Sequence, residues 1–316
     1  MIDRTYIKAP KTGIVIVTYN SESIIKECLK SILANEYSSF EIVVVDNDSS
    51  DKTVSRIQRY FKNVHIIENK QNVGFGSGNN IGIKYLRKKK CDYFLLLNPD
   101  TISSPNLVKK LVSVFENDKK IGVAGCIITY AKKNNKIWFA GGYFNKFFCY
   151  TRHRYMDMSI KHVNIKSGNT DFITGACMMI NLKIIRKVGF LPEEYFLYFE
   201  DVFFCQKAKE KGFSSYLLAQ PLISHHVSTS AGIKETNKMT PLRAYYFARN
   251  PILYIKKNVK GYLKFTNFLG QLFIRFPFYT YKIIREKNIK TFLYYCRGIV
   301  DGTFRETSSF FRNSER

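Results

Sequence analysis

Acidic residues are scarce in this sequence. It contains 25 Asp and Glu against 50 Lys and Arg in 316 residues, which makes a formal net charge of +25 at pH 7. The shortage is greatest near the C-terminus, where residues 234–316 carry 17 basic and only 5 acidic side chains. A charge of this size indicates an anionic partner, whether a phosphorylated substrate, a nucleic acid or an anionic membrane surface.

Paired cysteines are lacking as well. The seven cysteines are scattered, and no two of them form a C-x-x-C pair. No cysteine–histidine spacing suggests a zinc site, which excludes the common zinc-binding folds. Cys28, Cys126, Cys177 and Cys205 stand in apolar patterns, as buried free thiols in a reducing compartment do.

Apolar segments long enough to enter or cross a membrane are not evident. Residues 1–11 lack the apolar core of a secretory signal peptide. The longest uncharged runs of the basic tail, such as residues 265–274, fall well short of the roughly 20 residues that a spanning helix needs. We therefore expect a cytoplasmic protein that lies on the inner face of the plasma membrane without crossing it.

The common nucleotide and nucleic-acid signatures are missing too. There is no P-loop, and Gly74, Gly76 and Gly78 form G-x-G-x-G after the third predicted strand, unlike the G-x-G-x-x-G dinucleotide fingerprint after a first strand. No RNP, KH or zinc-finger pattern supports RNA or DNA binding, which then rests on charge alone. We expect no nucleic-acid partner.

Buried strands alternate with amphipathic helices over the first hundred residues. Apolar runs at residues 13–17, 40–45, 64–67 and 94–97 predict strands that are covered on both faces. Helical spacing of apolar residues separates them. This alternation predicts an α/β fold, with a Rossmann-like, mostly parallel sheet flanked by helices.

Polar loops follow three of these strands, where ligands bind in open α/β sheets. Asp46 begins an acidic loop that could hydrogen-bond a base or ribose, although it also suits a turn and helix cap. The Gly74 loop could bring backbone N–H groups to a nucleotide at a helix start. Asp100 could hold a divalent metal against a phosphate, although Asn98-Pro99-Asp100 is also an ordinary turn.

The second half of the sequence contains further candidates. Residues 131–170 are basic and predict an irregular insertion on the acceptor side. Glu200 and Asp201 are adjacent carboxylates among aromatic residues, a setting that raises pKa values, although they also suit a helix N-terminus. His225 and His226 follow a last strand, and one of such a pair can face a site while the other packs.

The tail interleaves Tyr, Phe, Leu and Ile with Lys and Arg from residue 253 to residue 311. Helices lying on an anionic membrane have this composition, as do helices that pack on a sheet and expose a charged face. The excess of positive charge favours the membrane. A homodimer through these helices is the other expectation.

Seven motifs in one order resemble the inverting glycosyltransferases of family 2, which have the GT-A fold, and most closely the bacterial rhamnosyltransferases that use dTDP-activated sugar. The resemblance covers roughly residues 12–255. The motifs are Val17-Thr18-Tyr19-Asn20, Val45-Asp46-Asn47-Asp48-Ser49-Ser50-Asp51, Asn72-Val73-Gly74-Phe75-Gly76 with Asn79-Asn80, Leu97-Asn98-Pro99-Asp100, Thr174-Gly175-Ala176, Phe199-Glu200-Asp201 and Tyr246-Phe247-Ala248-Arg249-Asn250.

The resemblance implies roles for these residues. The implied nucleotide-binding residues are Thr18, Tyr19, Asn20, Asp46, Asn72, Gly74, Asn98 and Arg249. The implied ligands of a Mg²⁺ or Mn²⁺ ion are Asp100, His225 and His226, with Asn98 replacing the first acid of the family's D-x-D-type motif. Asp201, or alternatively Glu200, would be the general base. Thr174, Gly175 and Ala176 would border the acceptor.

The implied organisation is a GT-A domain over residues 1–233 and a helical extension over residues 234–316. The domain would divide into a nucleotide-binding half, residues 12–110, and an acceptor half, residues 111–233. The implied partners are a dTDP- or UDP-linked sugar donor and a lipid-linked saccharide acceptor. A sugar nucleotidyltransferase is the competing enzyme, but residues 17–21 lack its Gly-rich, basic signature.

Overall fold

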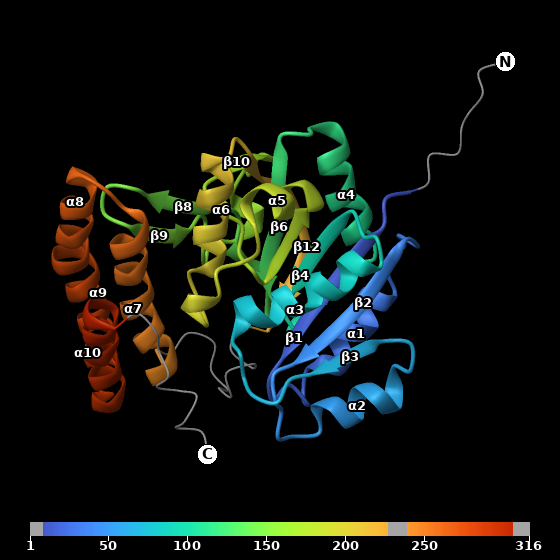
Figure 1. Cartoon of the computed structure of the whole chain (residues 1–316), viewed down its shortest axis with the longest axis horizontal. Coiled ribbons are helices and arrows are strands. Elements are labelled where there is room, and N and C mark those ends of the chain that lie inside the picture. Colours follow the sequence, from blue (N-terminus) through green and yellow to red (C-terminus); the bar gives the residue numbers. More distant parts are fainter. Residues whose placement is uncertain (1–8, 227–238, 306–316) are drawn as a thin grey trace.

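The computed structural model describes residues 9–226 and 239–305. The predicted domain boundary at residues 233 and 234 and the end of the tail, residues 306–316, lie outside these ranges. A central sheet with helices packed against it forms the larger part, and the C-terminal helices stand beside it (Figure 1). The α/β prediction is confirmed, whereas the division into domains remains a prediction.

The main sheet is mixed, with a parallel core formed by the strands that the sequence predicts. In spatial order its strands are β10 (Gly168–Thr170), β12 (Ser214–His225), β6 (Ile121–Tyr130), β11 (Cys177–Asn181), β4 (Tyr93–Leu97), β1 (Thr12–Thr18), β2 (Phe40–Asp46) and β3 (His65–Glu68). β4, β1, β2 and β3 are mutually parallel, and β11 inserts antiparallel between β4 and β6. β5 (Thr101–Ser103) pairs with β12.

The register brings the polar strand ends to one edge of the sheet. Thr18 pairs with Asp46, and Ile16 pairs with Leu97, the last residue of β4. Every residue of β4 is buried, because helices cover both faces of a parallel sheet. The predicted site residues that follow β1, β2 and β4 therefore begin at the same edge.

Helices connect these strands as the alternating pattern predicts. They are α1 (Ile25–Leu33), α2 (Thr53–Tyr60), α3 (Phe75–Lys88), α4 (Leu107–Asn117), α5 (Leu182–Val188) and α6 (Glu200–Glu210). α3 begins at Phe75, so Gly76 and Gly78 lie in a helix and not in the predicted loop. A Cβ on Gly78 would lie 2.9 Å from Val17 Cγ1, so this glycine allows close helix–sheet packing.

The prediction of an irregular segment over residues 131–170 is wrong. This stretch forms β7 (Lys133–Phe139), the hairpin of β8 (Gly142–Asn145) and β9 (Tyr150–His153), a short 3₁₀ turn at Ile160–His162, and β10. β7 extends the main sheet by pairing with β6. Lysines and asparagines on exposed edge positions conceal the strand pattern, because only one side of such a strand is buried.

The tail is helical, as predicted. α7 (Pro241–Asn258) begins at Thr240, whose hydroxyl caps the helix by accepting the Arg243 N–H at 3.3 Å. α8 (Tyr262–Gly270), a π turn at Gln271–Arg275 and α9 (Phe276–Arg285) follow without a break, and α10 (Ile289–Phe304) packs on α7. Within residues 9–226 and 239–305, no helix combines the length and apolar character needed to span a membrane.

Candidate active site

Asp46 anchors the junction between the loops after β1 and β2. Its Oδ1 accepts hydrogen bonds from Thr18 Oγ1 at 2.7 Å and Ser49 Oγ at 2.6 Å, and its Oδ2 accepts the Ser49 N–H at 2.8 Å. The Asn20 N–H donates to the same Ser49 Oγ at 2.9 Å. Thr18 and Asp46 are buried, Tyr19 is half-buried and Asn20 is exposed. The structure thus brings the four predicted nucleoside-pocket residues together in one bonded loop pair.

Gly74 joins this loop pair to a later part of the chain. Its N–H donates to Asn72 Oδ1 at 2.9 Å, and its carbonyl accepts the Asn47 side-chain amide at 3.2 Å. Gly74 has a φ of +85°, and a Cβ there would lie 2.5 Å from the Phe196 carbonyl oxygen. The same oxygen accepts the Phe75 N–H at 2.7 Å. The Gly74 and Phe75 N–H groups are therefore bonded to protein acceptors, and the structure does not aim them at a ligand.

Asp100 lies just past β4, as predicted, and is paired with the end of β12. Its Oδ1 is 2.9 Å from His225 Nε2, and its carbonyl accepts the His226 N–H at 2.8 Å. Both the Asp100 and His225 side chains are buried. Burial by itself would raise the pKa of Asp100, but the charge and hydrogen bond of His225 outweigh it, so the pKa lies below the ordinary value. Asp100 is thus held as a carboxylate.

The side chains of the two adjacent histidines lie in different surroundings. His225 lies inside β12, which the sequence predicts to end earlier, and its ring packs edge-on against Trp138 with centroids 4.5 Å apart. His226 is half-buried, with Nε2 3.6 Å from a Glu27 carboxylate oxygen. Of the two, His225 is therefore the one that shares a site with Asp100.

The fit of a metal ion to this site can be judged from its donor atoms. No group of three His, Cys, Asp or Glu side chains suited to a metal is present within residues 9–226 and 239–305. A carboxylate oxygen and an imidazole nitrogen nevertheless converge at Asp100 and His225. Mg²⁺ sites commonly combine one or two carboxylates with substrate phosphates and water. Asp100 and His225 would therefore fit an ion that takes its remaining ligands from a bound diphosphate, with the hydrogen bond between them exchanged for bonds to the ion and His225 Nε2 deprotonated.

Glu200 and Asp201 open α6, and their carboxyl groups differ in their partners. Asp201 Oδ2 accepts the Gly175 N–H at 3.1 Å, and its Oδ1 accepts the Val202 N–H at 2.7 Å. Glu200 is buried, and its Oε2 has no hydrogen-bond partner among the described residues. Burial, together with the neighbouring Asp201 charge, raises the pKa of Glu200 well above its usual range. Glu200 is therefore held as the neutral acid.

Asp201 is the residue predicted to act as general base, and its surroundings shift its pKa. Burial raises its pKa, and hydrogen bonds from the Gly175 and Val202 N–H groups offset part of that rise. A carboxylate with a raised pKa accepts protons more readily, provided that it is still ionised at the working pH. Asp201 is half-buried whereas Glu200 is buried, so Asp201 is the more exposed of the two residues.

The predicted acceptor residues lie between the two acidic sites. Asn98 N–H donates to the Ala176 carbonyl at 3.1 Å, which ties this segment to the loop that carries Asp100. Thr174 and Ala176 are buried beside Gly175. A Cβ on Gly175 would lie 2.8 Å from the Phe75 ring, so the segment also touches the start of α3. The structure therefore places residues 174–176 next to Asp201, Asn98 and α3.

Arg249 lies apart from the other nucleotide-binding candidates. Its side chain is fully buried, and Nη1 donates to the Glu194 carbonyl at 3.1 Å and to Asn250 Oδ1 at 2.9 Å. These partners belong to the segment before Glu200 and to α7 itself. The predicted pairing with a diphosphate therefore remains a prediction, while the observed bonds position a loop.

Asn250 is a site residue to which the sequence assigns no role. Its Nδ2 lies within hydrogen-bond distance of three carbonyl oxygens, those of Tyr195 at 3.0 Å, Leu197 at 2.8 Å and Tyr198 at 2.7 Å. Phe196, Tyr198 and Phe199 all have positive φ values, an uncommon conformation for bulky residues. Such a turn persists only when its surroundings fix it, and Asn250 supplies that fixation. The only sign of this role in the sequence is that Asn250 stands next to Arg249 in the last of the seven motifs.

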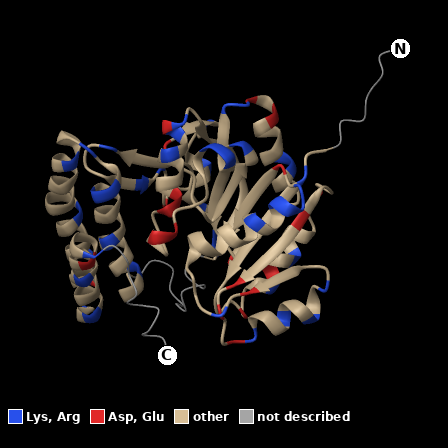
Figure 2. Ribbon diagram, in the orientation of Figure 1, with Lys and Arg blue, Asp and Glu red and all other residues tan. Residues whose placement is uncertain are grey.

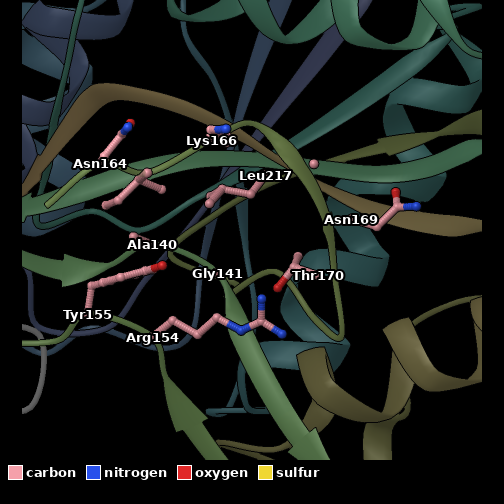
Figure 3. Close-up of a pocket in the computed structure, with 11 residues that line it drawn as sticks. Ala140, Gly141, Arg154, Tyr155, Asn164, Lys166, Asn169, Thr170 and Leu217 are labelled. Atoms are coloured by element: carbon pink, nitrogen blue, oxygen red, sulfur yellow. The ribbon is translucent and has the colours of Figure 1, made fainter.

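A pocket of about 270 Å³ opens elsewhere, beside β10 and the end of β9. Arg154, Tyr155, Thr170 and Leu217 are among the residues around it (Figure 3). None of the predicted site residues lines it, and it contains no carboxylate. This pocket is thus separate in composition from the acidic edge of the sheet.

Curated relatives resemble this chain over parts of their length. An uncharacterized glycosyltransferase of Haemophilus influenzae is 32% identical over 119 residues, which are 37% of this chain and 36% of the relative. The low-salt glycan biosynthesis hexosyltransferase Agl10 of Haloferax volcanii is 27% identical over 63% of this chain and 62% of its own length. The dTDP-rhamnosyl transferase RfbF of Shigella flexneri is 24% identical over 77% and 79%, respectively.

Solved structures agree on the fold. The mannosyltransferase PcManGT from Pyrobaculum calidifontis, in complex with GDP-Man and Mn²⁺, superposes with a TM-score of 0.59 at 14% identity, covering 94% of this chain and 88% of that one. The TarS fragment 1-349 of S. aureus gives a TM-score of 0.57 at 15% identity, covering 93% and 81%. The sheet and its helices therefore have the GT-A arrangement.

The sequence profile of Glycosyl transferase family 2 matches residues 13–189. This range includes β1 to β4, the Asp46 and Asp100 loops and the Thr174-Gly175-Ala176 segment, and it is more than half of the chain. The motif resemblance, the sheet order and the profile therefore lead to one conclusion: the chain belongs to glycosyl transferase family 2.

Proposed function

We propose that this protein is an inverting glycosyltransferase that moves a sugar from a nucleotide donor onto a hydroxyl of a lipid-linked saccharide. The observation that carries the proposal is the asymmetry of the two carboxyls at the start of α6. Asp201 is the more exposed of the two, burial raises its pKa, and its carboxylate is held by two backbone N–H groups, which suits a base for an acceptor hydroxyl. The Asp46 and Asp100 loops, which suit the donor, end at the same sheet edge.

The reaction is a single displacement. The acceptor hydroxyl oxygen forms a bond to the anomeric carbon while its proton passes to an Asp201 carboxylate oxygen. The bond between that carbon and the diphosphate breaks with its electron pair, so the nucleoside diphosphate leaves with the added charge. One in-line step inverts the anomeric configuration. A Mg²⁺ or Mn²⁺ ion held by Asp100 and His225 would neutralise the leaving diphosphate.

For the donor we propose dTDP-rhamnose, with a UDP-sugar as the alternative. The motif pattern and the similarity to a dTDP-rhamnosyl transferase support rhamnose. A UDP-linked galactose, glucose or N-acetylhexosamine would use the same loops. The basic, aromatic tail supports a lipid-linked acceptor and a site of action on the inner face of the plasma membrane, in polysaccharide or cell-wall assembly.

A donor screen tests this proposal. Purified protein is melted in the presence of dTDP- and UDP-sugars, each with Mn²⁺ and with EDTA, and slow hydrolysis of each sugar nucleotide is measured. We expect dTDP-rhamnose to give the largest increase in Tm and the fastest hydrolysis. If a UDP-sugar gave the larger increase in Tm and the faster hydrolysis, that UDP-sugar would be the donor instead of dTDP-rhamnose. If no sugar nucleotide stabilised the protein or was hydrolysed by it, and RNA gave a salt-sensitive gel shift, the proposed enzyme would be wrong. The protein would then be a nucleic-acid-binding protein.

A further inference from the structure

Large apolar side chains are exposed mainly on the tail. Of the 21 large hydrophobic side chains exposed among the described residues, 14 lie between Tyr262 and Phe304. Scattered single residues of this kind are normal on a soluble surface, but a concentration of them marks an interaction site. The most exposed on α8, the π turn and α9 are Tyr262 (72%), Phe265 (66%), Leu272 (58%), Phe273 (69%), Phe278 (56%), Tyr281 (68%) and Ile284 (63%).

These side chains form one stripe along a continuous helix. Tyr262, Phe265 and Phe268 are three residues apart, and Leu272 follows four residues later, the spacing of one helix face. The π turn at Gln271–Arg275 adds residues to one turn of the helix. Phe278, Tyr281 and Ile284, the most exposed apolar residues of α9, again follow one another at intervals of three residues.

A second segment, far away in sequence, packs on the face of α8 opposite the stripe. The turn between β8 and β9 docks its backbone on α8, because Asn267 Nδ2 donates to the Lys146 carbonyl at 2.8 Å and the Phe147 carbonyl at 2.9 Å. Gly270 lies against Phe148, whose carbonyl oxygen would be 2.5 Å from a Cβ at this position. The Phe147 and Phe148 side chains are exposed, by 43% and 39%. The hairpin thus places two aromatic residues on the side of α8 away from the stripe.

Positive charge surrounds the stripe. Exposed basic side chains near it are Lys260, Lys264, Arg285, Lys287 and Lys290. Glu286 is the single acid in residues 259–290, and its carboxylate accepts the Met239 N–H. Figure 2 shows basic residues along α8 to α10 with few acidic ones. A second copy of the chain would bring this basic surface against itself in a two-fold interface, and like charges there repel.

We infer that the exposed face of α8 and α9 is the surface that docks on an anionic lipid bilayer. Aromatic and aliphatic side chains would enter the headgroup boundary, and the lysines would meet lipid phosphates. α7 stays out of this contact, because it joins the core through Leu253 and Ile255 and holds the Glu200-Asp201 loop through Asn250. The bilayer would then lie one helix layer from the proposed base. The inference depends on the proposed function only for the identity of the acceptor.

Flotation of the full chain with vesicles, without substrate, tests this inference. We expect binding to equimolar phosphatidylglycerol–phosphatidylcholine vesicles and at least tenfold less to phosphatidylcholine alone. The triple variant Phe265→Ser, Phe273→Ser and Tyr281→Ser should lose at least tenfold in binding, whereas the pair Phe147→Ser and Phe148→Ser, on the other side of α8, should bind nearly as wild type. The control, Leu33→Ser with Tyr60→Ser, removes exposed apolar residues from the sheet domain and should bind as wild type.

Two results would overturn the inference. The first is equal flotation of the triple variant and wild type at matched Tm. The second is a dimer in sedimentation equilibrium that the triple variant dissociates, with no vesicle binding by either protein. Hydrolysis of the donor without vesicles is measured in parallel. When hydrolysis is retained and flotation is lost or absent, the result concerns only the proposed surface. When flotation is normal and hydrolysis is absent, the result concerns only the proposed reaction.

Discussion

The two acidic regions of the candidate site differ in how fully their carboxylates are satisfied. Asp46 accepts three hydrogen bonds from Thr18 and Ser49, and Asp100 is paired with His225. At the start of α6, by contrast, Glu200 Oε2 is buried without a partner among the described residues. Satisfied carboxylates fix the shape of a loop, while unsatisfied ones have shifted proton affinities. The first region therefore has loops of fixed shape, which we propose hold the donor, whereas the second contains the buried Glu200 beside Asp201, which we propose accepts the proton.

Of the variants that test this contrast, Asp201→Asn should have the largest effect on turnover. The amide keeps the shape of the side chain but cannot accept the acceptor's proton, so we expect kcat to fall by about 10²- to 10⁴-fold. Donor affinity, measured by calorimetry, should change little. Glu210→Gln, an exposed acid on the same helix, is the control and should retain full turnover. Near-normal turnover of the Asp201 variant would remove the proposed base.

The second test concerns the loop that carries this pair. Asn250→Ala removes the amide that bonds three carbonyls, so the turn at residues 195–199 should relax and misplace Asp201. Because misplacement of about 1 Å can cost 10²-fold, we expect kcat to fall by up to about that factor with the donor KM unchanged. Asn258→Ala on the same helix, whose amide bonds only the Tyr254 carbonyl, should behave as wild type. A folded fraction, measured by circular dichroism at the assay temperature, that falls as far as kcat does would indicate general unfolding instead of misplacement.

The third test concerns the donor region. Asp100→Ala should weaken nucleotide binding in Mn²⁺ by about tenfold or more, the range seen when support of a metal is lost. Affinity in EDTA should stay the same for variant and wild type. The matched control is Asp92→Ala, which removes an acid at the opposite end of β4. If Mn²⁺ made no difference to nucleotide affinity in wild type, Asp100 would have no metal to hold.

The smallest effect on activity is expected from Glu200→Gln, because glutamine resembles the neutral acid already present. Stability should change instead. The unfolded chain ionises Glu200 above its ordinary pKa of 4.5, whereas the fold keeps the proton, so wild-type stability falls with rising pH up to the raised pKa. That slope is about 1.4 kcal/mol per pH unit. The Tm of the variant should therefore exceed that of wild type increasingly above pH 4.5. Equal Tm values at pH 7 would contradict a protonated Glu200.

The sequence predicts the parallel core well, because β1, β2 and β4 are buried on both faces and consist of continuous apolar runs. The strands over residues 133–170 escape prediction because they are short, lie at edges and are rich in polar residues. At the site, the order of loops along one sheet edge identifies Asp46 and Asp100 as candidates. The two adjacent acids among aromatic residues identify Glu200 and Asp201. The role of Asn250 cannot be predicted, since it depends on positive φ values at three aromatic residues that no local pattern requires.

The contact between Gly74 and Phe196 limits how enzymes of this kind can be recombined. A methyl group at residue 74 would collide with the Phe196 carbonyl oxygen, which also accepts the Phe75 N–H. The donor-side loop and the loop before the proposed base are therefore complementary in shape. A chimera that joined one enzyme's donor half to another's acceptor half would need both loops from the same parent. Exchange of residues 72–76 together with 193–199 is therefore the smallest graft that should keep a working enzyme.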